Sequence, residues 1–263
     1  MKTMNPWHSL EDKTIWVTGG AGYFGAAITT ALDSLCRRVV CIDLGDRAAE
    51  LVGERGLSRT IPLSHNMAAA DSLPGMIESI VASHGLPDGV VHLSYATLGA
   101  GKSLQELPPG VFQKTLNQNM TPTFALCRDL AERMRPRRSG SIVLFSSIYG
   151  LVSPTPRNYL PPMNPNSIDY GVSKAAVLQL SRYFAVHYGP SAIRFNCITP
   201  GTFPHPPMQR SEPEFIQRLA GGSPLGRIGQ SHEIVGPTLF LLTDSASYVT
   251  GHNLVVDGGW TAW

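Results

Sequence analysis

A tyrosine and a lysine four residues apart are the most informative pair in this chain of 263 residues. On a helix, Tyr170 and Lys174 would share one face, and their side chains could reach one another. A phenol normally titrates near ~10, which is too high for proton transfer at neutral pH. A nearby ammonium favours the phenolate and lowers the pKa of the phenol. The pair predicts an acid–base site, with a half-buried tyrosine on a surface helix as the alternative.

A glycine-rich turn follows a short apolar run at positions 14–17. An alanine-rich helical stretch at 26–35 comes after the turn, and this order of strand, turn and helix is typical of dinucleotide binding. Gly19 permits the tight turn, Gly22 lets a pyrophosphate approach the backbone, and Gly25 allows the helix to pack on the strand. The free N–H groups of the helix N-terminus would then bind phosphate. A glycine loop without a ligand is the alternative.

A second apolar run, at positions 38–42, ends at Asp43. An acidic residue about 20 positions beyond the glycine turn can accept hydrogen bonds from the hydroxyls of the adenosine ribose. The same carboxylate would repel a 2′-phosphate, so the pattern favours NAD over NADP. Arg47 lies close by in sequence and complicates that preference. Capping of a helix N-terminus is the alternative role for Asp43.

Further motifs lie along the rest of the chain. Ser147 ends a predicted strand, Asn119 lies in a predicted helix, and a Pro-Gly pair at 200–201 follows another strand. The last predicted strand ends in Val-Asp-Gly-Gly at 256–259. Together with the Tyr-x-x-x-Lys pair, these motifs resemble the short-chain dehydrogenase/reductase family over nearly the whole chain. The resemblance implies one Rossmann-like NAD(P)-binding domain over 1–263, with ligands at the carboxyl ends of the strands.

The resemblance also implies an oxidoreductase that moves hydride between nicotinamide and a secondary alcohol or ketone. Tyr170 would take the proton of the hydroxyl, and Ser147 would hold the substrate oxygen. Lys174 would lower the proton affinity of the tyrosine and bind the nicotinamide ribose, and Asn119 would position a water that links Lys174 to solvent. The residues expected at the cofactor are Gly19, Gly22, Tyr23, Phe24, Gly25, Asp43, Leu44, Asn66, Met67, Ser94, Tyr95, Ala96, Tyr170, Lys174, Pro200, Gly201, Thr202 and Phe203.

Several positions depart from the short form of that family. Tyr23 stands where most short-form members have glycine, and a Ser-x-x-Tyr-Gly run occupies 146–150. Both features resemble the extended subfamily of sugar-nucleotide epimerases and dehydratases, although the chain stops too early for the substrate domain of that subfamily. Ser-Tyr-Ala-Thr at 94–97 replaces Asn-Asn-Ala-Gly, which leaves the local support of the sheet open. The alternative functions are therefore a sugar-nucleotide epimerase with retained NAD and a non-catalytic ligand-binding protein.

Two segments are expected to form the substrate region. An insertion at 154–166 separates the catalytic serine and tyrosine, and a lid near 202–225 contains His205, which could contact substrate or lie exposed. The insertion and its flank offer polar groups for hydroxyls, which favours a sugar or sugar-derived substrate, with structural packing as the alternative role. These groups belong to Tyr149, Asn158, Tyr159, Asn164 and Asn166.

The composition agrees with a single enzyme domain. The net charge is +2 and the basic run at 133–138 ends a helix, so nucleic-acid binding is not expected. No apolar stretch is long enough to cross a membrane and no leader is expected at 1–13, so the predicted location is cytoplasmic. The four cysteines lack metal-ligand spacing and are expected to be buried free thiols. A homodimer or homotetramer is expected, because the last strand of this family often lies at a subunit interface.

Strand and helix segments alternate along the chain, which predicts a doubly wound parallel sheet with helices on both faces. His92 is expected to be a core histidine of the fourth strand. Strands are expected near 14–18, 38–43, 59–63, 89–94, 141–146, 193–198 and 253–257. Helices are expected near 24–35, 69–84, 109–135, 170–188, 212–220 and 232–242.

Overall fold

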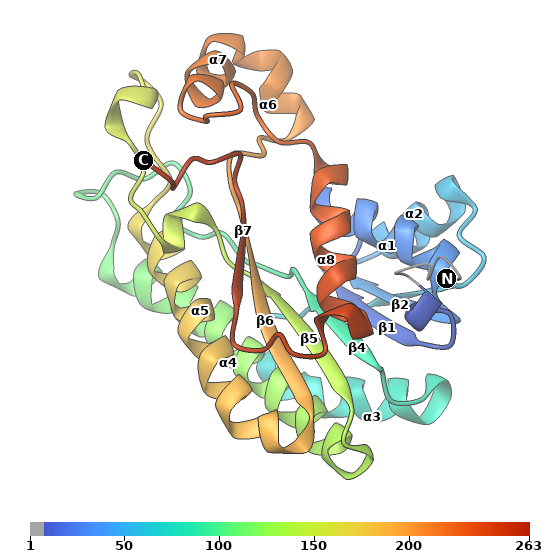
Figure 1. Ribbon diagram of the computed structural model, residues 1–263. Helices are drawn as coiled ribbons and strands as arrows, with labels where there is room; N and C mark the ends of the chain where they lie inside the picture. The colour runs from blue at the N-terminus through green and yellow to red at the C-terminus, as the bar shows by residue number, and fades with distance from the viewer. Residues whose placement is uncertain (1–7) are drawn as a thin grey trace.

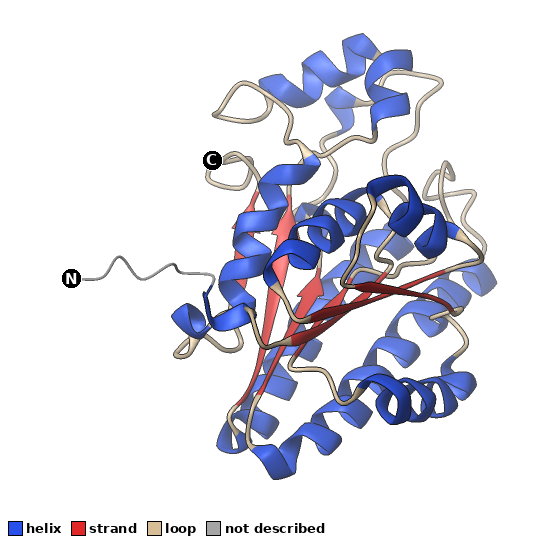
Figure 2. Cartoon of the chain, turned by 90° about the vertical axis from the view of Figure 1, so that its right-hand side faces the viewer, coloured by secondary structure: helices blue, strands red, loops and turns tan. Residues whose placement is uncertain are grey.

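The computed structural model describes residues 8–263, in which seven strands form one parallel sheet covered by helices (Figures 1 and 2). The strand order is β3-β2-β1-β4-β5-β6-β7, and all neighbouring strands are parallel. The predicted doubly wound α/β fold is confirmed. The strands are β1 Thr14–Thr18, β2 Arg38–Asp43, β3 Thr60–Ser64, β4 Gly89–His92, β5 Gly140–Phe145, β6 Ile193–Pro200 and β7 Asn253–Val256. Residues 1–7 lie outside the described residues, and they include part of the segment 1–13 in which no leader was expected.

The helices agree with the predicted segments except at four places. The helix that follows β2 and the short lid helix Pro206–Ser211 were not predicted. The helix predicted from 69 begins at Leu73 after a 3-10 turn. The helix predicted at 232–242 begins with a 3-10 turn, Ser231–Ile234, which Gln230 and Glu233 cap reciprocally. The helices are α1 Tyr23–Leu35, α2 Arg47–Arg55, α3 Leu73–His84, α4 Pro109–Met134, α5 Ile168–Tyr188, α6 Pro206–Ser211, α7 Pro213–Gly221 and α8 Val235–Leu242.

The central strands are buried on both faces because helices cover both sides of the sheet. Strands β1, β4 and β5 are buried at every position. One apolar cluster, with Trp16 and Leu126 among its members, packs the sheet against α3, α4 and α5. A second cluster, with Ile28 and Val143, packs the opposite face against α1 and α8. These two layers hold the carboxyl ends of the strands in fixed relative positions.

The lid and the insertion pack against one another. Helices α6 and α7 stand beyond the carboxyl ends of the strands, at the top of Figure 1. Phe215 and Leu219 of α7 join an apolar cluster with Ile148 and Trp260, and Tyr159 of the insertion packs on it. Arg218 Nε also donates a hydrogen bond to the carbonyl of Asn158 (2.9 Å). The insertion therefore supports the lid.

Other expectations concern membranes, metals and thiols. None of the described helices is long and apolar enough to span a bilayer. The described residues contain no group of three His, Cys, Asp or Glu side chains placed to hold a metal ion. Cys36, Cys41, Cys127 and Cys197 all lie in the described part of the chain, where each is a buried free thiol, as predicted.

Candidate active site

A cavity of about 580 Å³ lies where the strand order reverses between β1 and β4. Open α/β sheets bind ligands at this point, outside the carboxyl ends of the strands. The predicted site residues that line the cavity are Gly19, Gly22, Tyr23, Phe24, Gly25, Asp43, Leu44, Asn66, Met67, Ser94, Tyr95, Ala96, Asn119, Ser147, Tyr170, Lys174, Pro200, Gly201 and Phe203. Thr202 is absent from this lining: it is buried, and its carbonyl accepts a hydrogen bond from the backbone N–H of Gly229 (2.9 Å).

The glycine turn is shaped by close backbone contacts. Gly19 has a φ of +69°, which favours glycine, and a Cβ on Gly25 would lie 2.1 Å from the carbonyl oxygen of Gly19. Gly22 precedes α1 and has no side chain to cap it. The first N–H groups of a helix have no acceptor within the helix. They remain available here for an anion in the cavity, so the donors and the space both fit a pyrophosphate.

Asp43 ties the end of β2 to this turn. Its carboxylate is buried and accepts hydrogen bonds from the backbone N–H of Ala21 (2.9 Å) and of Leu44 (2.8 Å). Arg47 Nη1 lies 2.9 Å from Asp43 Oδ1 and is half exposed, so the arginine of the unpredicted α2 reaches the same carboxylate. The N-terminal cap of α2 is Asp46, which rules out the capping role for Asp43.

Aromatic side chains of the lid meet the glycine turn across the cleft. The Tyr23 ring lies 4.8 Å from the His205 ring, and the Phe24 ring lies 5.2 Å from the Phe203 ring, edge to face. His205 therefore lines the cavity beside the cofactor turn. At the adenine end expected from the sequence, Met67 is buried.

The serine and the tyrosine meet at the ends of β5 and α5. Ser147 lies two residues beyond the end of β5, and its hydroxyl accepts a hydrogen bond from the backbone N–H of Tyr149 (3.2 Å). Tyr170 lies in the first turn of α5. Burial raises the pKa of Tyr170, and a hydrogen bond with Ser147 acts in the opposite direction. A serine and a phenol in hydrogen-bonding contact can hold one substrate oxygen and exchange its proton.

Lys174 is one turn farther along α5 and is buried. Its Nζ donates to the carbonyl of Phe145 (3.0 Å) and lies 5.8 Å from the centre of the Tyr170 ring. Burial lowers the pKa of Lys174 to about 8. The expected lowering of the tyrosine pKa by this ammonium is not found in the protein alone. Burial of the phenol dominates, and the ammonium is bonded to the carbonyl of Phe145.

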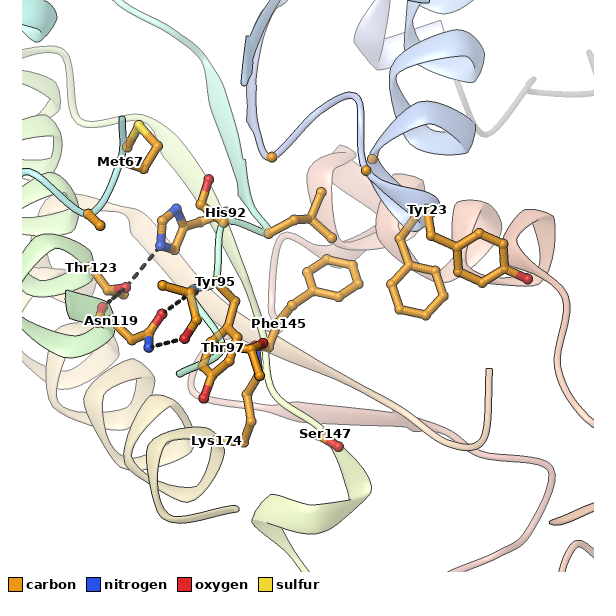
Figure 3. A pocket seen from close by; sticks show the side chains of 18 of the residues that line it. Tyr23, Met67, His92, Tyr95, Thr97, Asn119, Thr123, Phe145, Ser147 and Lys174 are labelled. Atoms are coloured by element: carbon orange, nitrogen blue, oxygen red, sulfur yellow. Dashed lines mark hydrogen bonds between the residues drawn. The ribbon is translucent and has the colours of Figure 1, made fainter. Parts of the chain in front are cut away.

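Asn119 supports the segment that follows β4. Its Oδ1 accepts from the N–H of Ala96 (2.8 Å), and its Nδ2 donates to the carbonyl of Ala96 (3.0 Å) (Figure 3). The Nδ2 also donates to the carbonyl of Thr115 (2.8 Å). The sequence alone left open how the Ser-Tyr-Ala-Thr segment at 94–97 is supported. These hydrogen bonds from Asn119 hold it against α4. Nearby, His92 is buried between the hydroxyls of Thr18 (2.6 Å) and Thr123 (2.9 Å), and burial lowers its pKa to about 4. It is a core histidine, as predicted.

The insertion contributes less to the cavity than the sequence suggests. Asn166 lines it, whereas the hydroxyls of Tyr149 and Tyr159 bond one another, and Asn164 Nδ2 donates to Gly101 (2.8 Å). Sequence reasoning missed other lining residues. Gln118 and Thr97 are next in sequence to the predicted residues Asn119 and Ala96. Their positions beside predicted residues were the only sequence feature that could have indicated them. Further lining residues outside the predicted cofactor and catalytic sets are Arg47, His65, Ala68, His92, Leu93, Pro122, Thr123, Phe145 and Ser146.

Comparison with known proteins places this fold and site among oxidoreductases. A sequence profile described as enoyl-(acyl carrier protein) reductase matches residues 21–261. A 2,5-dichloro-2,5-cyclohexadiene-1,4-diol dehydrogenase of Sphingobium indicum is 31% identical over 257 residues, which are 96% of this chain and 98% of the relative. An L-rhamnose 1-dehydrogenase (NAD(P)(+)) of Azotobacter vinelandii is 31% identical over 261 residues, 95% of this chain and 97% of the relative.

A solved structure agrees with these relatives. A short-chain dehydrogenase from Leptospira borgpetersenii with bound NAD+ superposes with a TM-score of 0.84 at 25% identity, covering 99% of this chain and 97% of that chain. The chain belongs to the short-chain dehydrogenase/reductase family, in its short form. It is an NAD(P)-dependent oxidoreductase that acts on CH–OH groups.

Proposed function

We propose that the protein is an NAD-dependent dehydrogenase that interconverts a secondary alcohol and its ketone, with a sugar or sugar-derived compound as substrate. The observation that carries the proposal is a single cavity that joins Ser147, Tyr170 and Lys174 to the glycine turn and Asp43. When bound, the nicotinamide accepts or returns the hydride. The chain itself supplies proton transfer, orientation and exclusion of water.

In the oxidation direction, Ser147 Oγ holds the substrate hydroxyl and Tyr170 Oη takes its proton. Burial raises the pKa of Tyr170, so the phenolate needs positive charge beside it. Lys174 supplies a cation at this end of the cavity and would bind the ribose hydroxyls. Asn119 would position the relay water that links Lys174 to solvent, although its side-chain amide is bonded to Ala96 and Thr115 and its carbonyl accepts from the Thr123 hydroxyl (2.6 Å).

NAD is the proposed cofactor because Asp43 ends β2 inside the cavity. A carboxylate accepts hydrogen bonds from ribose hydroxyls and repels a 2′-phosphate. Arg47 neutralises part of that charge, since its guanidinium is paired with Asp43. The proposed preference for NAD therefore depends on the carboxylate and is weakened by the arginine. The NAD+ in the Leptospira structure supports the assignment, and the name of the rhamnose enzyme includes both cofactors.

The proposed substrate is polar because the cavity is lined by uncharged hydrogen-bonding side chains. Thr97, Gln118 and Asn166 line the cavity together with the catalytic residues. Sites built to pair hydroxyls discriminate strongly against analogues that lack them. The relatives named for a cyclic diol and for L-rhamnose support a hydroxylated ring as substrate.

The oligomeric proposal is a homodimer or homotetramer. Exposed apolar side chains lie on α4 and α5, where Phe124 is 43%, Tyr183 is 71% and Val186 is 80% exposed. Exposed apolar residues that gather on paired helices favour contact with another protein surface. Sedimentation velocity of the purified chain tests this assignment, and a monomer at micromolar concentration would contradict it.

The substrate proposal is tested with NAD and a panel of sugars, sugar nucleotides, polyols, hydrophobic secondary alcohols and β-ketoacyl thioesters. Oxidation of the alcohols is measured as formation of NADH, and reduction of the ketoacyl thioesters is measured as loss of NADH. We expect the highest kcat/KM with a sugar or polyol. Preference for the hydrophobic set would overturn the substrate class and leave hydride transfer intact. Epimer formation without net NADH would identify the epimerase alternative instead.

A further inference from the structure

Tyr95 lies inside the catalytic centre at a position where sequence reasoning assigned only cofactor contact. Its ring meets the ring of Tyr170 edge to face, with centres 5.2 Å apart and planes at 84°. Lys174 Nζ lies 4.4 Å from the centre of the Tyr95 ring, closer than to the Tyr170 ring. Figure 3 shows Lys174 extending alongside Tyr95. One side chain thus contacts both members of the Tyr-x-x-x-Lys pair.

The backbone beside Tyr95 is fixed. Both backbone polar groups of Ala96 are bonded to the side-chain amide of Asn119, at 2.8 Å and 3.0 Å. Asn119 in turn donates to Thr115 within α4. The backbone next to Tyr95 is therefore attached to helix α4 through two hydrogen bonds, which limits the movement of the residue that carries the ring.

The face of an aromatic ring attracts a cation most strongly where water is excluded. Lys174 is buried, and its ammonium has one hydrogen bond to protein, to the carbonyl of Phe145. The titratable groups around it are Tyr170 on its own helix, His92 on β4, Cys197 on β6 and Tyr95 itself. None of these four carries a negative charge at neutral pH, because burial raises the pKa of both phenols and of the thiol. The ring face of Tyr95 is thus the main electron-rich group beside the cation after that carbonyl.

The hydroxyl of Tyr95 contributes little to this arrangement. It is buried and makes no hydrogen bond of acceptable geometry to any described residue. The nearby hydroxyl of Ser173 donates to the carbonyl of Asp169 instead (2.8 Å). Burial raises the pKa of both phenols, but only Tyr170 is hydrogen-bonded to Ser147, so Tyr95 does not replace Tyr170 as the acid–base group.

We propose that Tyr95 is a positioning residue of the reaction, whose ring face holds the Lys174 ammonium and whose edge-to-face contact fixes the Tyr170 ring. The proposal rests on the proposed dehydrogenase function for its kinetic consequence. Its electrostatic part concerns the protein alone. The ring would keep the lysine protonated and aimed at the cofactor ribose while the tyrosine exchanges its proton.

The direct test is the titration of Lys174 without substrate or cofactor. The chain has five lysines, so protein labelled with [ε-13C]lysine gives few Cε signals, and Lys174→Arg assigns the one of interest. Tyr95→Leu keeps an apolar side chain but removes the ring, and we expect the pKa of Lys174 to fall by about 1 unit from about 8. Tyr95→Phe keeps the ring, and we expect the pKa of Lys174 to stay unchanged in this variant.

Phe184→Leu is the matched control, because Phe184 is a buried ring of the same helix that packs on Phe195, outside the cavity. The Phe184→Leu control should leave the pKa of Lys174 unchanged. With any substrate that the protein oxidises, kcat should fall at least tenfold in Tyr95→Leu and remain near wild type in the control. An unchanged or raised lysine pKa in Tyr95→Leu, or an equal shift in Tyr95→Phe, would overturn the proposal. Failure to oxidise any alcohol would overturn the proposed function while the titration still decides the role of the ring.

Discussion

Replacing Asp43 with asparagine should change both cofactor choice and stability. The carboxylate accepts two backbone N–H groups and pairs with Arg47 at 2.9 Å. Asparagine offers one oxygen, so one of the N–H donors loses its acceptor, at a cost of about 1–3 kcal/mol. The ribose contact of NAD also loses a charged acceptor, which contributes about 1.5–3 kcal/mol. We therefore expect kcat/KM with NAD to fall by roughly 10- to 150-fold.

The same variant should gain relative activity with NADP. Removal of the carboxylate ends its repulsion of a 2′-phosphate and leaves the guanidinium of Arg47 without an ionic partner. The assay compares kcat/KM for both cofactors in wild type, Asp43→Asn, Arg47→Ala and the double variant. If Arg47 binds the phosphate, the gain with NADP should be smaller in the double variant than in Asp43→Asn. A wild type that prefers NADP, or an unchanged cofactor ratio in Asp43→Asn, would refute this reasoning. Urea unfolding separates loss of stability from loss of ribose binding.

Three further variants test other parts of the structure. Gly25→Ala should weaken NADH binding, measured by fluorescence titration, because its Cβ would lie 2.1 Å from the carbonyl of Gly19, whereas Gly53→Ala on α2 has open space and should not. Asn119→Leu should lower the free energy of unfolding by about 1–3 kcal/mol for each polar group of Ala96 left unpaired, and a urea midpoint equal to wild type would contradict the hydrogen bonds described. Burial raises the pKa of Cys36 to about 12, so the folded thiol keeps a proton that the unfolded thiol loses near pH 9. Stability should therefore decline as the pH rises from about 9 to 12, and a decline equally steep in Cys36→Ala would show that this thiol has no part in it.

The strands were predictable because a buried parallel strand is an unbroken apolar run. All seven observed strands overlap the predicted segments within the described chain. Helix α2 was not predicted, since it is short, contains Gly53 and has few apolar residues to mark a buried face. The first turn of α3 was also misplaced, because a proline in the first turn permits either a helix or the 3-10 turn that precedes it.

The candidate site was predictable where chemistry depends on spacing along one element. Tyr170 and Lys174 lie on one helix, and Gly19, Gly22 and Gly25 lie in and just after one turn. Both groups could therefore be recognised from a short stretch of sequence. The contact of Tyr95 with Lys174 joins the end of β4 to α5, and no periodicity reports such a contact. The polar insertion illustrates the same limit. Tyr159 of the insertion is hydrogen-bonded to Tyr149 and packs against α7. The composition of the insertion alone did not distinguish this packing role from substrate binding.

Turnover of Tyr170→Phe tests the central claim most directly. The substitution keeps the half-buried ring against Tyr95 and removes only the hydroxyl that is proposed to exchange the substrate proton. General acid–base catalysis contributes roughly 10²–10⁴-fold, so kcat should fall by at least that factor. The dissociation constant for NADH should stay close to that of wild type. Turnover near the wild-type rate, with NADH binding intact, would contradict the assignment of Tyr170 as the acid–base residue.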